Sequence, residues 1–216
     1  MKVKERMSVD VKTIQLDSNI SEAFKLMKEN NCRRLPVINH GKLMAMITLT
    51  DLNLATPSMA TTLSIHELNY ILARTLIKDI LPPKPKLITI GPDNYIETAA
   101  NIMRENKISA LPVVDKGELV GIITETDLFD ALIEILGVKK AHTRIDTFAP
   151  DGPGGLADIT GIMAARGINI LNTVLYYDEK LARYKVILRI EDLDYQEVAD
   201  ELIDHGYEIE SIIVKQ

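Results

Sequence analysis

The chain has 216 residues, of which 46% are hydrophobic and 26% charged, as in ordinary soluble globular proteins. No stretch approaches the roughly 18 consecutive apolar residues of a membrane span, and the charged start MKVKERMSVD is followed by no apolar stretch. A single cysteine excludes an internal disulfide. We therefore expect a cytoplasmic protein with no signal peptide and no membrane partner.

The net charge of −6 is distributed unevenly along the chain. Residues 142–216 carry 7 basic and 14 acidic side chains, whereas residues 1–141 carry 18 and 17. Nucleic-acid binding needs clustered positive charge, so the acidic C-terminal part argues against a nucleic-acid partner. The balanced N-terminal part leaves room for small anions.

An internal duplication organises the first part of the chain. A shift of 76 residues aligns residues 11–55 with residues 87–131, with about 19 identities in 45 pairs. Chance would give only a few identities, so the two segments are copies of one structural unit.

The first elements of each copy follow from hydrophobic periodicity. Short strands are predicted over residues 11–16 and 87–90. Apolar residues spaced i, i+3, i+4 and i+7 predict a helix over residues 20–27, and the same spacing recurs 76 residues later. Asn94, followed by Glu97 three residues on, predicts the cap of the second helix.

A hairpin and a last helix complete each copy. LPVINHGKLMAMIT indicates a strand, a turn at Gly41 and a second strand, and LPVVDKGELVGIIT repeats this around Gly117. A final helix is predicted to open at Asp51 in the first copy and at Asp127 in the second. Each copy is therefore β-α-β-β-α.

Residues 58–76, between the copies, are predicted to be a linker with its own helix. The apolar residues of this helix are Ile65, Leu68, Ile71 and Leu72. The proline-rich segment 82–86 excludes helix.

The duplicated part resembles a tandem pair of CBS domains, known as a Bateman module. The resemblance rests on the two LPV segments, the two glycine turns, and the motifs Thr48-Leu-Thr-Asp51 and Thr124-Glu-Thr-Asp127. It implies a first CBS repeat over residues 7–57 and a second over 77–136. Such modules usually bind AMP, ADP, ATP or S-adenosylmethionine between the repeats, so an adenine nucleotide is the implied regulatory ligand, with no required cofactor.

The resemblance also implies the residues of two clefts. One cleft would use Thr48, Thr50 and Asp51 with Ile108 and Ser109, and the other Thr124, Thr126 and Asp127 with Cys32 and Arg33. Arg33 and Arg34 lie where the family often places a phosphate partner, which favours the second cleft for phosphate. The alternatives are that the threonines and aspartates only cap helices and that the arginines form a solvated face.

Residues 143–216 predict the order β-α-β-β-α-β of a ferredoxin-like sandwich. The predicted strands are 143–149, 168–177, 183–190 and 207–215, and the predicted helices are 154–167 and 195–206. The segment from Gly152 to Ala157 matches the dinucleotide fingerprint G-x-G-x-x-A. The next two strands are joined by a five-residue loop and must pair antiparallel, which argues against a dinucleotide-binding fold.

Residues 143–216 resemble an ACT domain, through the motifs Asp151-Gly-Pro-Gly154-Gly-Leu and Gly167-Ile-Asn169-Ile. ACT domains commonly associate side by side and bind amino acids at the shared edge. The resemblance implies Asp151, Gly154 and Asn169 as contacts for an amino or keto acid. A dimerisation module with an empty edge is the alternative.

Two CBS repeats followed by an ACT domain are similar to the AcuB-type acetoin-utilisation family, and the expected fold class is α+β. The four histidines follow no metal-ligand spacing, and no nucleophile elbow or Walker loop is present. We expect a regulatory, ligand-sensing homodimer without metal or enzymatic activity, acting on an unidentified protein partner. The alternatives are a structural adaptor without a small-molecule ligand and a hydrolase or transferase acting on a bound nucleotide.

Overall fold

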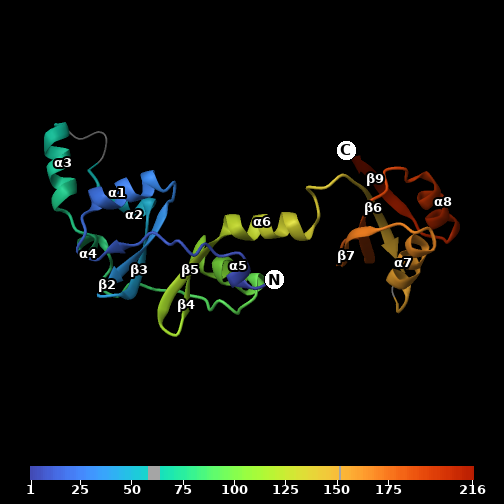
Figure 1. Ribbon diagram of the computed structural model, residues 1–216, viewed down its shortest axis with the longest axis horizontal. Coiled ribbons are helices and arrows are strands. Elements are labelled where there is room, and N and C mark those ends of the chain that lie inside the picture. The colour runs from blue at the N-terminus through green and yellow to red at the C-terminus, as the bar shows by residue number, and fades with distance from the viewer. Residues whose placement is uncertain (58–63, 151) are drawn as a thin grey trace. The chain divides into compact units, whose positions relative to one another are not determined.

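The computed structural model describes residues 1–57, 64–150 and 152–216. It divides into two compact units, Met1–Leu128 and Phe129–Gln216 (Figure 1). The first unit contains the duplicated part as far as Leu128, and the second contains the last residues of that part and the C-terminal sheet. Both units combine helices with strands, which confirms the predicted α+β class.

The first repeat forms the predicted β-α-β-β-α order. Its elements are β1 (Ile14–Gln15), α1 (Ile20–Glu29), β2 (Arg34–Asn39), β3 (Lys42–Thr48) and α2 (Leu49–Ala55). β2 pairs in parallel with β1 and antiparallel with β3. α1 buries Ile20, Ala23 and Met27, the face that the apolar spacing indicates, and Asn19 caps it by accepting a hydrogen bond from the Glu22 N–H at 2.9 Å.

The second repeat has the same order without a first strand. Its elements are α5 (Ile96–Asn106), β4 (Ala110–Asp115), β5 (Glu118–Thr124) and α6 (Glu125–Ile135). Ile90 forms an isolated parallel bridge with Val113, so the strand predicted over residues 87–90 is wrong beyond this one residue. The strand predicted over residues 11–16 is likewise reduced to β1.

The prediction that Asn94 caps the second helix is wrong. α5 begins after Tyr95, which makes no side-chain cap, and the Asn94 amide donates to the Gly91 carbonyl at 3.3 Å. In the 76-residue register, Tyr95 corresponds to Asn19, so the capping side chain has been lost from the second copy. The Asn-x-x-Glu pattern is offset by one residue from the real start of the helix.

In the described part of the chain between the hairpin-containing repeats, the structure has two helices, α3 (Ile65–Arg74) and α4 (Ile77–Ile80). α3 confirms the helix predicted in the linker, although the first part of that linker, residues 58–63, lies outside the described residues. Ser64 caps α3 by accepting a hydrogen bond from the Glu67 N–H at 3.3 Å. α4 has no counterpart among the predicted elements.

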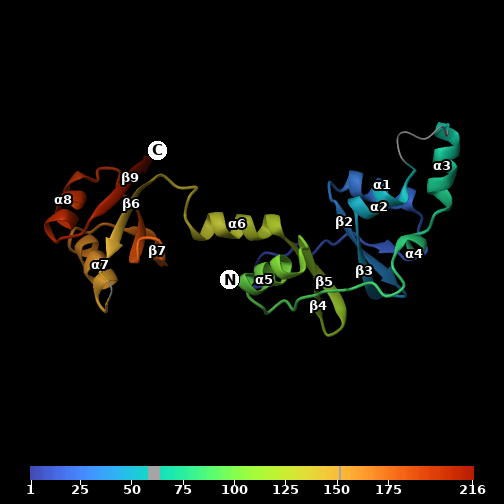
Figure 2. The ribbon, with the colours of Figure 1, turned by 180° about the vertical axis from the view of Figure 1, so that it is seen from behind.

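The two repeats exchange the short segments that precede them. A 3-10 helix, Val3–Glu5, comes before the first repeat but packs on the second, where the Val3 N–H donates to the Asn94 carbonyl at 2.8 Å. α4 leads into the second repeat but packs on the first, and the Ile77 N–H donates to the Ser18 carbonyl at 2.8 Å. Figures 1 and 2 both show the N-terminus beside α5. The exchange joins the two repeats into one compact unit.

The core of the first repeat lies between its hairpin and helices α1, α2 and α4. Leu35, Ile47 and Leu52 are fully buried there, together with Ile77 from the exchanged segment. Each side chain of this size contributes about 1.5–3 kcal/mol when fully buried. The hairpin β4–β5 likewise packs on aliphatic side chains, since Leu111, Val113 and Ile123 are fully buried.

The second unit is the predicted ferredoxin-like sandwich. Its elements are β6 (His142–Ala149), α7 (Gly155–Ala165), β7 (Ile170–Asp178), β8 (Arg183–Ile190), α8 (Gln196–Asp204) and β9 (Ile209–Lys215). The sheet has the order β7-β8-β6-β9, with every neighbouring pair antiparallel. This topology excludes a doubly wound dinucleotide fold for the glycine-rich segment before α7.

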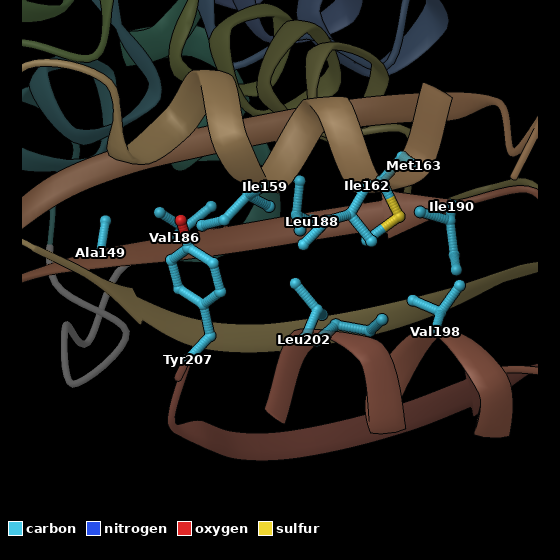
Figure 3. Close-up of a cluster of buried hydrophobic side chains, with 11 residues drawn as sticks. Ala149, Ile159, Ile162, Met163, Val186, Leu188, Ile190, Val198, Leu202 and Tyr207 are labelled. Atoms are coloured by element: carbon cyan, nitrogen blue, oxygen red, sulfur yellow. The ribbon is translucent and has the colours of Figure 1, made fainter. Parts of the chain in front are cut away.

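Both helices of this unit contribute to one apolar core. Figure 3 shows Ile159 and Met163 of α7 and Leu202 of α8 pointing into a cluster with Val186 and Leu188 of β8. All five are fully buried. Within the described residues, no helix is both long enough and apolar enough to cross a membrane.

Candidate functional site

The two Thr-x-Thr-Asp motifs form matching helix caps at the ends of β3 and β5. The Thr48 N–H and Oγ1 donate to Asp51 Oδ2 at 2.8 and 2.6 Å, and the Asp51 N–H donates back to Thr48 Oγ1 at 3.2 Å. The corresponding distances between Thr124 and Asp127 are 2.7, 2.7 and 3.4 Å. α2 and α6 therefore begin two residues before the predicted Asp51 and Asp127, because each aspartate closes a capping box from inside the first turn.

The first cap opens onto a cavity of about 610 Å³ between the repeats, here called the Thr48 cleft. Its polar and charged lining residues are Arg33, Arg34, Thr48, Thr50, Asn53, Lys86, Asn106, Lys107 and Ser109. Its apolar side includes Met46, Ile88 and Ile108. The volume is within the usual range for small-molecule sites, about 300–1,000 Å³.

The second cap opens onto a cavity of about 450 Å³, here called the Thr124 cleft. Its polar and charged lining residues include Ser8, Asp10, Lys12, Asn30, Asn31, Arg33, Arg34, Thr124, Glu125 and Thr126. Cys32 and Ile122 also line it. Both clefts thus combine threonine hydroxyls, the first turn of a helix, arginines and aliphatic side chains.

Most of the residues that the resemblance implied lie in these two clefts. Thr48, Thr50, Ile108 and Ser109 line the Thr48 cleft, and Thr124, Thr126 and Cys32 line the Thr124 cleft. Asp51 and Asp127 line neither cleft, since their Oδ2 atoms are engaged by the caps.

Arg33 and Arg34 line both clefts, so Arg33 does not by itself distinguish the two. Arg34 is half-buried, and its guanidinium donates to Ser109 Oγ of the other repeat. Burial lowers the pKa of Arg34, and the neighbouring charge of Arg33 lowers it further, while Glu125 raises it. Arginine nevertheless stays charged at neutral pH, so this side chain is a fixed cation between the clefts.

Several charged lining residues were missed by the sequence reasoning. Lys86 and Lys107 line the Thr48 cleft, and Asp10, Lys12 and Glu125 line the Thr124 cleft. Lys86 and Asp10 occupy equivalent positions in the 76-residue register, just outside the aligned segments, so the repeat gave no signal for either. Such short connecting segments carry no periodicity of their own.

The second unit has a smaller cavity, of about 420 Å³, at the start of α7. Its walls are Ala149, Pro150, Gly152, Gly154, Gly155, Leu156, Ala157, Leu175 and Tyr184. Gly154, predicted as an amino-acid contact, lies in this wall and has φ of +104°, a conformation that favours glycine. Asn169 is exposed outside the cavity and donates to Glu191 Oε2 at 2.7 Å, while Asp151 lies outside the described residues.

Comparisons with known families cover both units. The CBS domain family model matches residues 3–56 and 77–134, which together make up about half of the chain. The ACT domain family model matches residues 143–206.

Curated relatives match the duplicated part. A CBS domain-containing protein from Dictyostelium discoideum is 37% identical over 136 residues, covering 62% of this chain and 92% of its own length. The CBS domain-containing protein YhcV of Bacillus subtilis is 30% identical over 126 residues, covering 58% and 81%.

Two solved structures share this fold. The CBS domain pair of protein MJ0100, solved in complex with 5′-methylthioadenosine and S-adenosyl-L-methionine, is 29% identical with a TM-score of 0.50, covering 65% of this chain and 98% of its own. A structure from Vibrio cholerae described as an acetoin utilization protein (AcuB) is 25% identical with a TM-score of 0.52, covering 64% and 95%.

Proposed function

This chain belongs to the CBS-domain family, carries an ACT domain after its CBS pair, and is similar in that pair to the AcuB protein of Vibrio cholerae. We propose that it is a regulatory protein that binds adenine-containing ligands in its Thr48 and Thr124 clefts. The observation that carries the proposal is the duplicated cleft. Each copy places two threonines, the first turn of a helix and a shared pair of arginines around a cavity of ligand size.

The cleft chemistry suits a nucleotide. Threonine hydroxyls and the N–H groups at the start of α6 can donate to phosphate, and Arg33 and Arg34 add positive charge. Aliphatic side chains such as Ile108 and Ile122 offer apolar contacts for adenine. The caps use Oδ2 of Asp51 and of Asp127, so in this proposal the second oxygen of each carboxylate accepts from a ribose hydroxyl of the bound ligand.

The MJ0100 comparison supports the class of ligand. Its CBS pair was solved with two adenosyl compounds, 5′-methylthioadenosine and S-adenosyl-L-methionine. A ligand acts on a protein through unequal affinity for two conformations, so occupancy of the clefts would be transmitted to an unidentified protein partner by a change in population. The Gly154 cavity is lined mainly by glycine and apolar residues, so an amino or keto acid there would depend on backbone groups.

Calorimetric titration with AMP, ADP, ATP and S-adenosylmethionine tests the proposal. We expect micromolar binding of at least one ligand. An Asp127→Asn variant keeps an acceptor for the Thr124 cap but loses the carboxylate charge, so we expect wild-type thermal stability with about tenfold weaker binding at the Thr124 cleft.

Asp130→Ala provides the matched control, because Asp130 is exposed on the same helix and takes no part in the Thr124 cap. This variant should bind as the wild type does. An unchanged ligand affinity in Asp127→Asn would show that the Asp127 carboxylate does not take part in binding. No heat with any of the four ligands, on folded and nucleotide-free protein, would contradict the proposal and favour the structural adaptor.

A further inference from the structure

The duplication allows the two clefts to be compared position by position. At four positions of the 76-residue register, one residue lines the Thr48 cleft and its counterpart of different charge lines the Thr124 cleft. With the residue of the Thr48 cleft given first, these pairs are Lys86 and Asp10, Ile88 and Lys12, Lys107 and Asn31, and Leu49 and Glu125. These substitutions between copies change the charge of each cleft while the fold around it stays the same.

The Thr48 cleft is the more cationic of the two. At the differing positions it carries Lys86 and Lys107, and none of the described residues that line it is a carboxylate. The Thr124 cleft carries Asp10 and Glu125 against a single lysine, Lys12. Arg33 and Arg34 line both clefts and therefore cancel in the comparison. The differing positions contribute +2 to the Thr48 cleft and −1 to the Thr124 cleft, a difference of three formal charges.

Local contacts reinforce this difference. Lys86 Nζ donates to Asn106 Oδ1 at 2.9 Å, which holds the ammonium at the wall of the Thr48 cleft. In the Thr124 cleft, Lys12 Nζ pairs with Asp10 at 2.8 Å, so its charge is already compensated. Glu125 lies near enough to Arg34 to offset part of the lowering of its pKa that burial and Arg33 cause.

We propose that the clefts are specialised by charge: the Thr48 cleft takes an adenine nucleotide with two or three phosphates, and the Thr124 cleft takes an adenosyl compound with little or no negative charge. This inference rests on the proposed function of both clefts. Two lysines without a lining carboxylate complement the multiple charges of a polyphosphate. In the Thr124 cleft, Asp10 and Lys12 compensate each other, so Glu125 would face that polyphosphate as a like charge, whereas an uncharged or cationic adenosyl group meets no such repulsion.

Titrations with ATP and with uncharged 5′-methylthioadenosine test the assignment. We expect one ATP per chain, and we expect protein saturated with ATP still to bind 5′-methylthioadenosine. A Lys86→Asp/Lys107→Asn variant gives the Thr48 cleft the residues of the other copy. It should bind ATP about tenfold more weakly or worse. Asn suits position 107, whose φ is +54°, since Asn31 has φ of +47° at the equivalent position.

Two further variants complete the test. Lys84→Asp changes an exposed lysine of the same proline-rich segment that does not line the cleft, and it should bind ATP within about twofold of the wild type. Asp10→Lys/Glu125→Leu gives the Thr124 cleft residues of the other copy and should add a second ATP site. That second site should weaken with added salt, as screened charge interactions do.

Equal ATP binding at both clefts of the wild type would overturn the specialisation, as would an unchanged ATP affinity in Lys86→Asp/Lys107→Asn. Competition of ATP and 5′-methylthioadenosine for a single site would also overturn it. In each of these outcomes the chain still binds adenine compounds. Failure of the proposed function would look different, because neither ATP nor 5′-methylthioadenosine would then bind.

Discussion

At the residue scale, Gly121 shows how the exchanged N-terminal segment constrains the second repeat. A Cβ atom at this position would lie 2.5 Å from Met7 Sδ and 3.1 Å from the Ser8 carbonyl oxygen. The equivalent residue of the first repeat is Ala45, which is buried at 1% exposure. The second copy therefore has glycine where the first has alanine because Met7 and Ser8 occupy the space that the methyl group would need.

We expect Gly121→Ala to lower the free energy of unfolding by about 1–3 kcal/mol, because the added methyl group overpacks the contact with Met7 and Ser8. Urea unfolding followed by circular dichroism measures the change. Gly161→Ala is the contrasting variant, since a Cβ at this position of α7 meets nothing within 4 Å. It should be neutral or stabilising by up to about 1 kcal/mol. Equal stability of Gly121→Ala and the wild type would show that the N-terminal segment moves aside at no cost.

At the scale of elements, the exchanged segments are held by equivalent ion pairs. Lys78 of α4 pairs with Asp17 at 2.7 Å, and Lys2, its counterpart in the 76-residue register, pairs with Asp93 at 3.0 Å. Lys4 of the 3-10 helix adds a second pair with Asp93 at 2.9 Å. Hydrogen bonding to Lys78 lowers the pKa of Asp17, and hydrogen bonding to Lys4 and Lys2 lowers that of Asp93.

These shifts predict an acid-sensitive attachment of both segments. A carboxyl whose pKa is lowered on folding stabilises the protein above its ordinary pKa of 3.8, and that contribution is lost as the pH falls through the folded-state value. The wild type should therefore be slightly more stable than Asp17→Asn/Asp93→Asn near neutral pH. The difference should shrink below about pH 3.8. Urea midpoints across this range measure it, and a difference independent of pH would contradict an ionic origin.

At the scale of the whole molecule, we expect a homodimer formed through the β7 edge of the second unit. β7 is nine residues long and has no partner strand on its outer side within the described residues. Leu175, Tyr176 and Tyr177 on this strand are 41–47% exposed. An exposed apolar edge strand readily pairs with another copy of itself.

Light scattering at micromolar concentration tests this expectation. The wild type should have the mass of a dimer, and Tyr177→Lys should shift the equilibrium toward monomer because lysine on an edge strand opposes pairing. Leu193→Lys is the matched control, since Leu193 is also an exposed apolar residue but lies outside the strands. A monomeric wild type, or a Tyr177→Lys variant that remains fully dimeric, would exclude the β7 edge.

Features that depend on neighbours in the chain could be predicted from the sequence. The spacing of Ile20, Ala23 and Met27 predicts the buried face of α1, because helical periodicity is a local property. The Thr48 and Thr124 motifs indicate helix starts for the same reason, although the helices begin two residues earlier than expected. The repeat, and the short loop between the predicted strands 168–177 and 183–190, are likewise enough to predict two similar units and an antiparallel C-terminal sheet.

Features that depend on contacts between distant segments were decided by the tertiary structure. The exchange of Val3–Glu5 and α4 between the repeats has no local signature, because each segment is short and its partners lie some 60–90 residues away in sequence. The same holds for Lys86 and Lys107, which become neighbours of Thr48 only when the repeats pack together. Local periodicity therefore specifies the elements, whereas the charge of each cleft depends on which segments the packing of the two cores brings to its walls.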